Sequence, residues 1–235
     1  MPAWDESWLA SARGQRRDLW RGVEAQHRVA TMRLADNLHE QELLEQLLES
    51  SKPKLPAAAA GKHYLLFTPF RYVAEWPSRF RRPEEAGAWY GADDALTVAA
   101  EVAFWRWKFF MDSDGLRDGQ LVTEHTFFQA RFEGLELDIT QPPWNGLRSQ
   151  WRDGEDYSHC HVLASRVRGL PAPVQAIRYE SARREGGLCQ VVFDLAALSL
   201  PQPHLQQTWV CKTTQALVLL THEHESIEIR MPSPR

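Results

Sequence analysis

The sequence lacks long apolar runs and is poor in cysteine. No segment approaches the roughly 20 consecutive apolar residues of a membrane-spanning helix, and the N-terminal residues contain no apolar run of signal-peptide type. The three cysteines, Cys160, Cys189 and Cys211, are widely spaced and odd in number. We therefore expect a reduced, cytoplasmic protein that does not enter a membrane and needs no disulfide framework.

A large excess of charge is also absent. The chain carries 27 Lys and Arg against 31 Asp and Glu, a net charge of −4 at pH 7. Such a balance does not favour nucleic-acid binding through bulk electrostatics. With 235 residues, of which 43% are hydrophobic, the chain can bury a full core, and we expect one globular domain plus an appendage.

Several well-known functional motifs are missing. No Gly-x-Gly-x-x-Gly and no P-loop occurs, which excludes these two phosphate cradles as recognisable motifs. No Gly-x-Ser-x-Gly elbow surrounds Ser181, so nucleophilic hydrolase chemistry is not expected there. The histidines of residues 159–161 and 222–224 do not have zinc-ligand spacing. We expect no metal site.

The first 52 residues contain apolar positions at helical spacing. This pattern predicts an amphipathic helix and, after a break near Leu34, a second helix that Asp36 or Asn37 caps and that ends at residues 50–56. We expect residues 1–62 to form a helical extension that packs on the main domain or on a partner. The apolar residues of the two predicted helices are Trp8, Leu9, Leu19, Trp20, Val23, Leu43, Leu44, Leu47 and Leu48.

From His63 onward the pattern changes to short strands with few helices. Helices are predicted from Ala95 to Met111, with Asp93 or Asp94 as the N-cap, and from Tyr157 to Arg168. Because strands outnumber helices, we expect an α+β fold with largely antiparallel sheets. The predicted strands are residues 63–68, 87–91, 123–132, 135–139, 176–179, 188–193, 208–213, 216–221 and 226–229.

An arginine-rich loop precedes the helix at Ala95. A guanidinium presents a rigid fork of donors that matches phosphate, so several arginines on one loop suit a diphosphate ligand. The alternative is a solvated basic loop that faces Glu84 and Glu85. The arginines of this loop are Arg71, Arg79, Arg81 and Arg82.

Glu101 is the candidate catalytic group. Its neighbours at three and four residues along the helix are Thr97, Val98, Phe104 and Trp105, so the carboxylate shares a face with apolar groups. A carboxylate in that position must be paired or must perform chemistry. The alternative is that Glu101 pairs with Arg106 or Lys108 or lies at the solvent border.

Tyr90 and Ser181 are further candidates at strand ends. Tyr90 lies between Gly87 and Gly91, whose lack of a side chain lets a ligand or another backbone come close. Its ring could stack on a flat ligand, or it could be a core aromatic residue. Ser181 follows a predicted strand and could donate a hydrogen bond into a cleft, or it could be an ordinary turn residue.

Four short motifs, taken in order, resemble the RES domain family. This family takes its name from an arginine, a glutamate and a serine, which correspond to Arg79, Glu101 and Ser181. The resemblance covers roughly His63 to Glu225, and the first 62 residues resemble the extension of the longer members. Val98 departs from the usual alanine, without an expected consequence. The matching motifs are residues 78–80, 87–92, 97–102 and 179–183.

The resemblance implies a fold similar to ADP-ribosyltransferase toxins and a RES domain at residues 63–235. Members are toxins of type II toxin–antitoxin pairs, inhibited by an Xre-type antitoxin that carries the DNA-binding part. They degrade NAD by hydrolysis or phosphorolysis, or transfer ADP-ribose to a protein such as phosphoribosyl pyrophosphate synthetase. The site implied here comprises Arg71, Arg79, Tyr90, Glu101 and Ser181, with NAD as substrate, no metal, and a homodimer or toxin–antitoxin hetero-oligomer as assembly.

Two other functions stay open on the sequence. In a non-catalytic nucleotide-binding or protein-interaction module, Glu101 and the arginines would form a buried salt-bridge cluster and the N-terminal helices a docking arm. A glycosidase would need a second acid near Glu101, for which Glu180 is the candidate.

Overall fold

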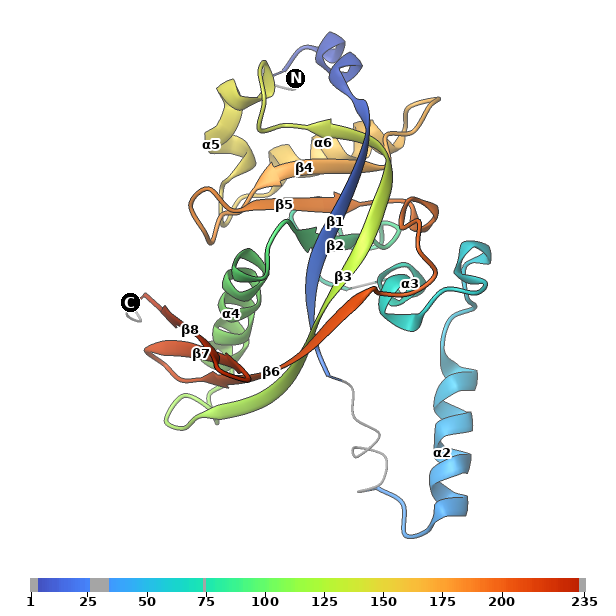
Figure 1. The fold of residues 1–235 in the computed structure, drawn as a ribbon, viewed down its shortest axis with the longest axis vertical. Coiled ribbons are helices and arrows are strands. Elements are labelled where there is room, and N and C mark those ends of the chain that lie inside the picture. Colours follow the sequence, from blue (N-terminus) through green and yellow to red (C-terminus); the bar gives the residue numbers. More distant parts are fainter. Residues whose placement is uncertain (1–3, 26–33, 74, 233–235) are drawn as a thin grey trace.

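The computed structural model describes residues 4–25, 34–73 and 75–232. Within this part of the chain, eight strands form one sheet in the order β1-β2-β5-β4-β3-β6-β7-β8, and β1 pairs with β3 as well, which closes the first five strands into a ring (Figure 1). The strands are β1 (Arg13–Glu24), β2 (Trp89–Ala92), β3 (Leu121–Asp138), β4 (Ala176–Glu180), β5 (Leu188–Val192), β6 (Leu205–Thr213), β7 (Leu217–His222) and β8 (Glu225–Arg230).

The sheet is antiparallel at every pairing of these strands except β3 with β4. This confirms the expected α+β class with largely antiparallel strands. The helices are α2 (Leu38–Ser51), α3 (Tyr64–Arg71), α4 (Ala95–Asp112), α5 (Arg148–Trp151) and α6 (Ser158–Arg168), and the short 3₁₀ turns are η1 (Glu6–Ser11), η2 (Ala57–Ala59), η3 (Trp144–Leu147) and η4 (Leu195–Ala197).

The long strand β3 separates two apolar clusters. Phe127 belongs to one cluster and its neighbour Phe128 to the other, and both are fully buried. Successive side chains of a strand point to opposite faces, so both faces of β3 are covered here. The sequence predicted two strands in this region, whereas β3 continues through Gly134, where an added Cβ would lie 2.4 Å from the side-chain oxygen of Gln175.

The helices expected around the candidate site are confirmed. Helix α4 begins at Ala95, as predicted, and ends at Asp112, one residue beyond the predicted end. Asp94 is the N-cap of this helix, since the Asp94 carboxylate accepts a hydrogen bond from the Thr97 backbone N–H at 2.7 Å. In the same way Asn37 caps α2 by accepting from the Glu40 N–H at 3.0 Å. Helix α6 also lies where the sequence placed it.

Two further secondary-structure predictions were wrong. Residues 13–24, expected to be helical, form β1, which pairs with β3 along its whole length. Gly14 and Gly22 weaken a helix there, and the long-range pairing with β3 decides the outcome. Residues 63–68, expected as a strand, begin helix α3, because a short apolar run does not distinguish a strand from a buried helix.

Helix α2 stands away from the sheet at one end of the molecule (Figure 1). None of its residues is buried, and it is tied to α3 by an ion pair of 2.9 Å between Glu49 and Arg71. The division at residue 62 stays a prediction, although β1 joins the first part of the chain to the sheet of the second. Residues 26–33 of the predicted helical extension lie outside the described residues.

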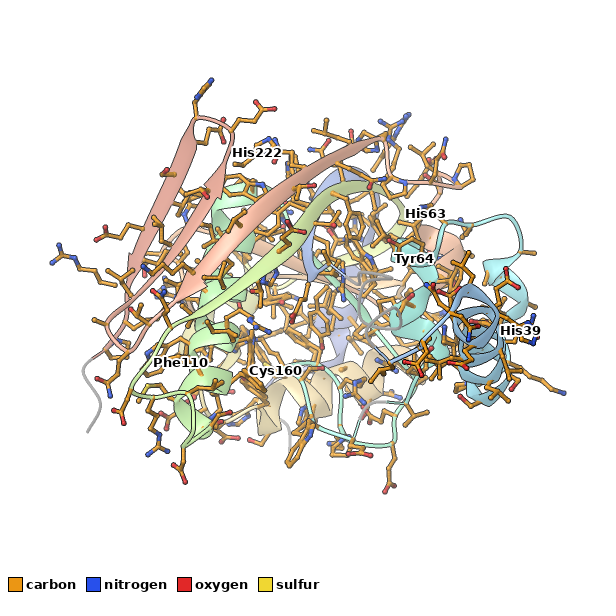
Figure 2. All side chains as sticks on the ribbon, turned by 90° about the horizontal axis from the view of Figure 1, so that it is seen from below. His39, His63, Tyr64, Phe110, Cys160 and His222 are labelled. Atoms are coloured by element: carbon orange, nitrogen blue, oxygen red, sulfur yellow. The ribbon has the colours of Figure 1, made fainter. Side chains whose placement is uncertain are left out.

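None of the described helices is long and apolar enough to cross a membrane. All three cysteines are free and buried, and Figure 2 labels Cys160 on α6.

Candidate active site

A cavity of about 360 Å³ lies between β1, β2 and α4, and we call it the first cavity. Three of the predicted site residues line it: Arg79, Tyr90 and Glu101. Its walls also include side chains that are far apart in the sequence, such as Trp20 of β1 and Tyr157 before α6. The fold therefore brings together three of the predicted groups around one space.

Glu101 lines the first cavity from helix α4. Among the described residues, no arginine, lysine or histidine nitrogen forms an ion pair with its carboxylate. The pairs considered from sequence do not form, because Arg106 binds Glu24 at 2.6 Å and Lys108 binds Asp112 at 3.2 Å. Glu101 is therefore not part of a salt-bridge cluster in this part of the chain.

Ser181 lies behind Glu101 and orients it. Its hydroxyl donates to Oε1 of Glu101 at 2.6 Å and accepts hydrogen bonds from the backbone N–H groups of Arg183 and Arg184 at 3.0 and 3.1 Å. Since both N–H groups point at the oxygen, the hydroxyl proton is directed to Glu101. Ser181 is 0% exposed and does not line the cavity, so its link to the site is the hydrogen bond to the Glu101 carboxylate.

Tyr90 holds the turn that carries Arg79. Its phenol oxygen lies 2.8 Å from the Ser78 hydroxyl and accepts a hydrogen bond from the Phe80 N–H at 3.1 Å. Burial raises the pKa of Tyr90, so the phenol is protonated at neutral pH. The glycines before and after Tyr90 let other backbone segments pack closely against this strand. An added Cβ at Gly87 would lie 1.9 Å from the Pro69 carbonyl oxygen.

Arg79 is almost fully buried at the side of the first cavity. Its Nη1 donates to the carbonyl oxygens of Trp151 and Asp153 at 2.9 and 2.6 Å, and its guanidinium lies 4.9 Å from the centre of the Tyr157 ring. Carbonyl oxygens and an aromatic face hold the cation without neutralising it. Arg79 therefore contributes positive charge to the site.

The structure does not bring Arg71 to this site. Its Nη1 pairs with Glu49 and its Nε donates to the Pro53 carbonyl oxygen at 2.7 Å, so it joins α3 to the end of α2. The second acid considered for a glycosidase, Glu180, is also directed elsewhere, since it binds Arg148 at 2.5 Å. The other acid that lines the first cavity is Glu24, which is paired with Arg106.

Residues missed by the sequence analysis complete the walls. Arg21 on β1 lines the first cavity. It was missed because the sequence predicted a helix for this segment. Arg183 lies at the end of the motif at residues 179–183, and its guanidinium packs 3.4 Å from the centre of the Phe104 ring. Cys189 also lines the cavity, and burial raises the pKa of its thiol well above the usual value, which excludes a thiolate nucleophile at neutral pH.

His125 on β3 lines the first cavity, and its burial makes the stability of the protein depend on pH. Burial, assisted by the charge of Arg106, lowers the pKa of His125 from 6.5 to about 4. The unfolded chain therefore binds a proton below pH 6.5 that the folded chain takes up only below about pH 4. Stability is lost as the pH falls through this window, by about 3 kcal/mol in total.

We expect His125→Gln to remove this contribution. Chemical denaturation at pH 7, 6, 5 and 4 would give a free energy of unfolding that falls less steeply in the variant than in the wild-type protein. The difference between the two curves isolates His125 from the carboxylates, which titrate in both. Parallel curves would contradict the assignment.

No group of three or more His, Cys, Asp or Glu side chains that could hold a metal ion occurs among residues 4–25, 34–73 and 75–232. Two of the histidines noted in the sequence have other contacts. Nε2 of His161 lies 2.8 Å from the Ser78 carbonyl oxygen, and Nδ1 of His222 (labelled in Figure 2) lies 2.9 Å from the Thr208 carbonyl oxygen.

The fold and the cavity together define a mixed α+β protein whose site holds an arginine and a glutamate that forms no ion pair within the described residues. Residues 54–214 match the RES domain, and the chain belongs to the RES domain family. Among solved structures, it is similar to a chain of the M. tuberculosis MbcT-MbcA toxin–antitoxin complex, with 16% identity over 96% of this chain and 93% of that chain and a TM-score of 0.48. A search of the curated proteins finds no significant match.

Proposed function

We propose that this protein is the toxin of a type II toxin–antitoxin pair and that it cleaves the nicotinamide–ribose bond of NAD. The observation that carries the proposal is Glu101, which lines the first cavity without a cationic partner among the described residues and receives the Ser181 hydrogen bond. Membership of the RES domain family and the position of Arg79 in the same cavity support it.

The chemistry needs stabilised positive charge at the ribose. The bond between ribose C1′ and the pyridinium nitrogen breaks, its electron pair leaves with neutral nicotinamide, and C1′ develops oxocarbenium character, as in glycoside cleavage. Glu101 stabilises this charge, and Ser181 keeps the carboxylate oriented. An acceptor then attacks C1′ and loses its proton. Tyr90 stacks near the nicotinamide, and Arg79 supplies positive charge for the diphosphate.

Incubation of the purified protein with NAD labelled in its ADP-ribose part tests this reaction and identifies the acceptor. Free ADP-ribose indicates hydrolysis, ADP-ribose 1″-phosphate in phosphate buffer indicates phosphorolysis, and label on a protein band after addition of cell lysate indicates transfer to a protein. Intact NAD in all three conditions would refute the proposed reaction. Inhibition by the antitoxin co-expressed with the toxin would test the proposed pairing.

Ser181→Ala is expected to lower kcat with little change in KM. The hydrogen bond to a charged group is worth about 1.5–3 kcal/mol, which corresponds to roughly a 10- to 100-fold fall in rate if the carboxylate loses its orientation. Steady-state kinetics of nicotinamide release would measure the two constants. A purely structural Ser181 would instead lower the amount of folded enzyme while kcat per active site stayed constant, which active-site titration distinguishes.

A second candidate function, a protein-interaction module, is favoured by α2. Several leucines of this helix are exposed, among them Leu43 and Leu47. Such a face is suited to binding another protein. The module and the enzyme differ in one observable: expression of an interaction module leaves the cellular NAD concentration unchanged.

A further inference from the structure

A second cavity, of about 550 Å³, adjoins the first. It lies between β1, helix α3 and the segment from Ser78 to Tyr90. Arg21, Glu24, Ser78 and Tyr90 line both cavities, so the two spaces meet at these side chains. Each volume lies within the range of roughly 300–1,000 Å³ typical of ligand pockets. The two cavities therefore adjoin at these four residues.

The second cavity has aromatic and apolar walls at its far end. Tyr64 and Leu65 of α3 and the following Tyr72 line it, and Tyr64 is 52% exposed. Figure 2 shows Tyr64 on α3 beside His63, and their ring centres lie 4.5 Å apart. Flat aromatic rings at the rim of a concave space are suited to stacking on a planar heterocycle.

Arg21, at the junction of the cavities, forms no ion pair within the described residues, and its guanidinium carbon lies 5.5 Å from the centre of the Trp89 ring. Its Nη1 donates to the Tyr90 carbonyl oxygen at 2.8 Å, whereas its Nε is buried and has no hydrogen-bond partner among the described residues. The nearby carboxylate of Glu24 is paired with Arg106. Burial lowers the pKa of Arg21 to about 10, which leaves it protonated at neutral pH.

This arrangement costs free energy in the unliganded protein. A buried charge is unfavourable unless it is paired, and a buried donor without an acceptor adds to that cost. Other buried charges of this sheet are compensated: Arg17 binds Glu136 at 2.8 Å, and Arg178 binds Asp93 through two hydrogen bonds. Arg21 differs from them in that no carboxylate pairs with it among the described residues, so an anionic ligand at the junction would compensate its charge.

We propose that Arg21 binds the diphosphate of a dinucleotide that spans both cavities, with the nicotinamide riboside half in the first cavity and the adenosine half in the second. The inference rests on the proposed function for the identity of the ligand. It adds a residue from β1, outside the segment at 54–214 that matches the RES domain. A guanidinium fork suits two phosphate oxygens, and Tyr64 or Tyr72 stacks on the adenine.

Isothermal titration calorimetry with ADP, adenosine and nicotinamide tests the proposal without any turnover. Arg21→Met is expected to weaken ADP binding at least tenfold, or 1.4 kcal/mol, and to change adenosine binding less than twofold. Thr68→Trp, which adds a ring inside the second cavity, is expected to weaken ADP and adenosine alike by at least tenfold and to leave nicotinamide unaffected. Arg16→Met, an exposed arginine on the same strand, is the matched control and should bind all three normally.

Folding of each variant is checked by circular dichroism and thermal denaturation. Arg21→Met removes an uncompensated cation, so its Tm is expected to equal or exceed that of the wild-type protein. Arg21→Lys keeps the charge and loses the fork, and it should bind ADP with intermediate affinity.

ADP affinity that is unchanged in Arg21→Met, or no ADP binding by the wild-type protein, would overturn the inference. Adenosine affinity that is unchanged in Thr68→Trp would also overturn it, because the adenosine half would then bind elsewhere. The failure of the proposed reaction can be told apart from the failure of this site. If ADP binding depends on Arg21 but the protein leaves NAD intact, the site is supported and the cleavage is refuted. Cleavage of NAD with ADP affinity independent of Arg21 refutes this site alone.

Discussion

Glu101→Gln is expected to fold normally and to cleave NAD about 10²- to 10³-fold more slowly than the wild-type protein, a loss of roughly 3–4 kcal/mol. The amide keeps the size of the side chain and can still accept the Ser181 hydrogen bond. It loses the negative charge that would face the developing cation at C1′. Because Glu101 forms no ion pair within the described residues, the substitution leaves no buried cation without its partner.

The rate of nicotinamide release measures this effect, with thermal denaturation as the test of folding. Asp112→Asn is the matched control, since it makes the same carboxylate-to-amide change on α4 at a side chain that is 63% exposed and paired with Lys108. The control should retain full activity. Full turnover by Glu101→Gln would exclude the proposed role of the carboxylate.

Phe128→Ala is expected to lower the free energy of unfolding by about 3–5 kcal/mol. The ring is fully buried in the second apolar cluster, 6.4 Å from the centre of the Trp89 ring, so truncation leaves a cavity between β3 and β2. The cost combines the lost transfer free energy with the loss of contacts around that cavity.

Urea denaturation of the variant and of Val122→Ala separates burial from strand propensity. Val122 lies on the same strand but is 55% exposed, and its replacement should change stability by no more than about 0.5 kcal/mol. Phe127→Ala, on the opposite face of β3, should match Phe128→Ala. Equal, small effects at all three positions would contradict the burial of both faces of the strand.

Helix α4, which carries Glu101, could be predicted because its signals are local. Asp94 as N-cap and the apolar neighbours of Glu101 are all within a few residues of one another, and the structure has the helix and the cap as predicted. The motifs around Arg79, Glu101 and Ser181 could be identified for the same reason. Their assembly in one cavity, and the hydrogen bond between Ser181 and Glu101, needed the fold.

The arginines show the limit of prediction from local pattern. On the loop pattern alone, Arg71 and Arg79 were both candidates for binding a diphosphate, and the resemblance to the RES domain marked Arg79 in addition. In the structure Arg71 lies at the end of α3 against Glu49, and Arg79 lies in a turn that Tyr90 holds at the cavity. Arg21 was not considered, because residues 13–24 were expected to form a helix. Only as strand β1 does this segment place Arg21 at the cavity.

The sequence by itself determined the fold class, the helix that carries Glu101 and the family, because capping residues, apolar periodicity and short motifs act over a few neighbouring positions. The tertiary structure alone decided which cations face the cavity, that residues 13–24 form a strand, and that the Ser181 hydroxyl donates to Glu101. These outcomes depend on pairings between residues 80 or more positions apart, such as Arg21 with Phe128 across β1 and β3, and no local pattern records such contacts.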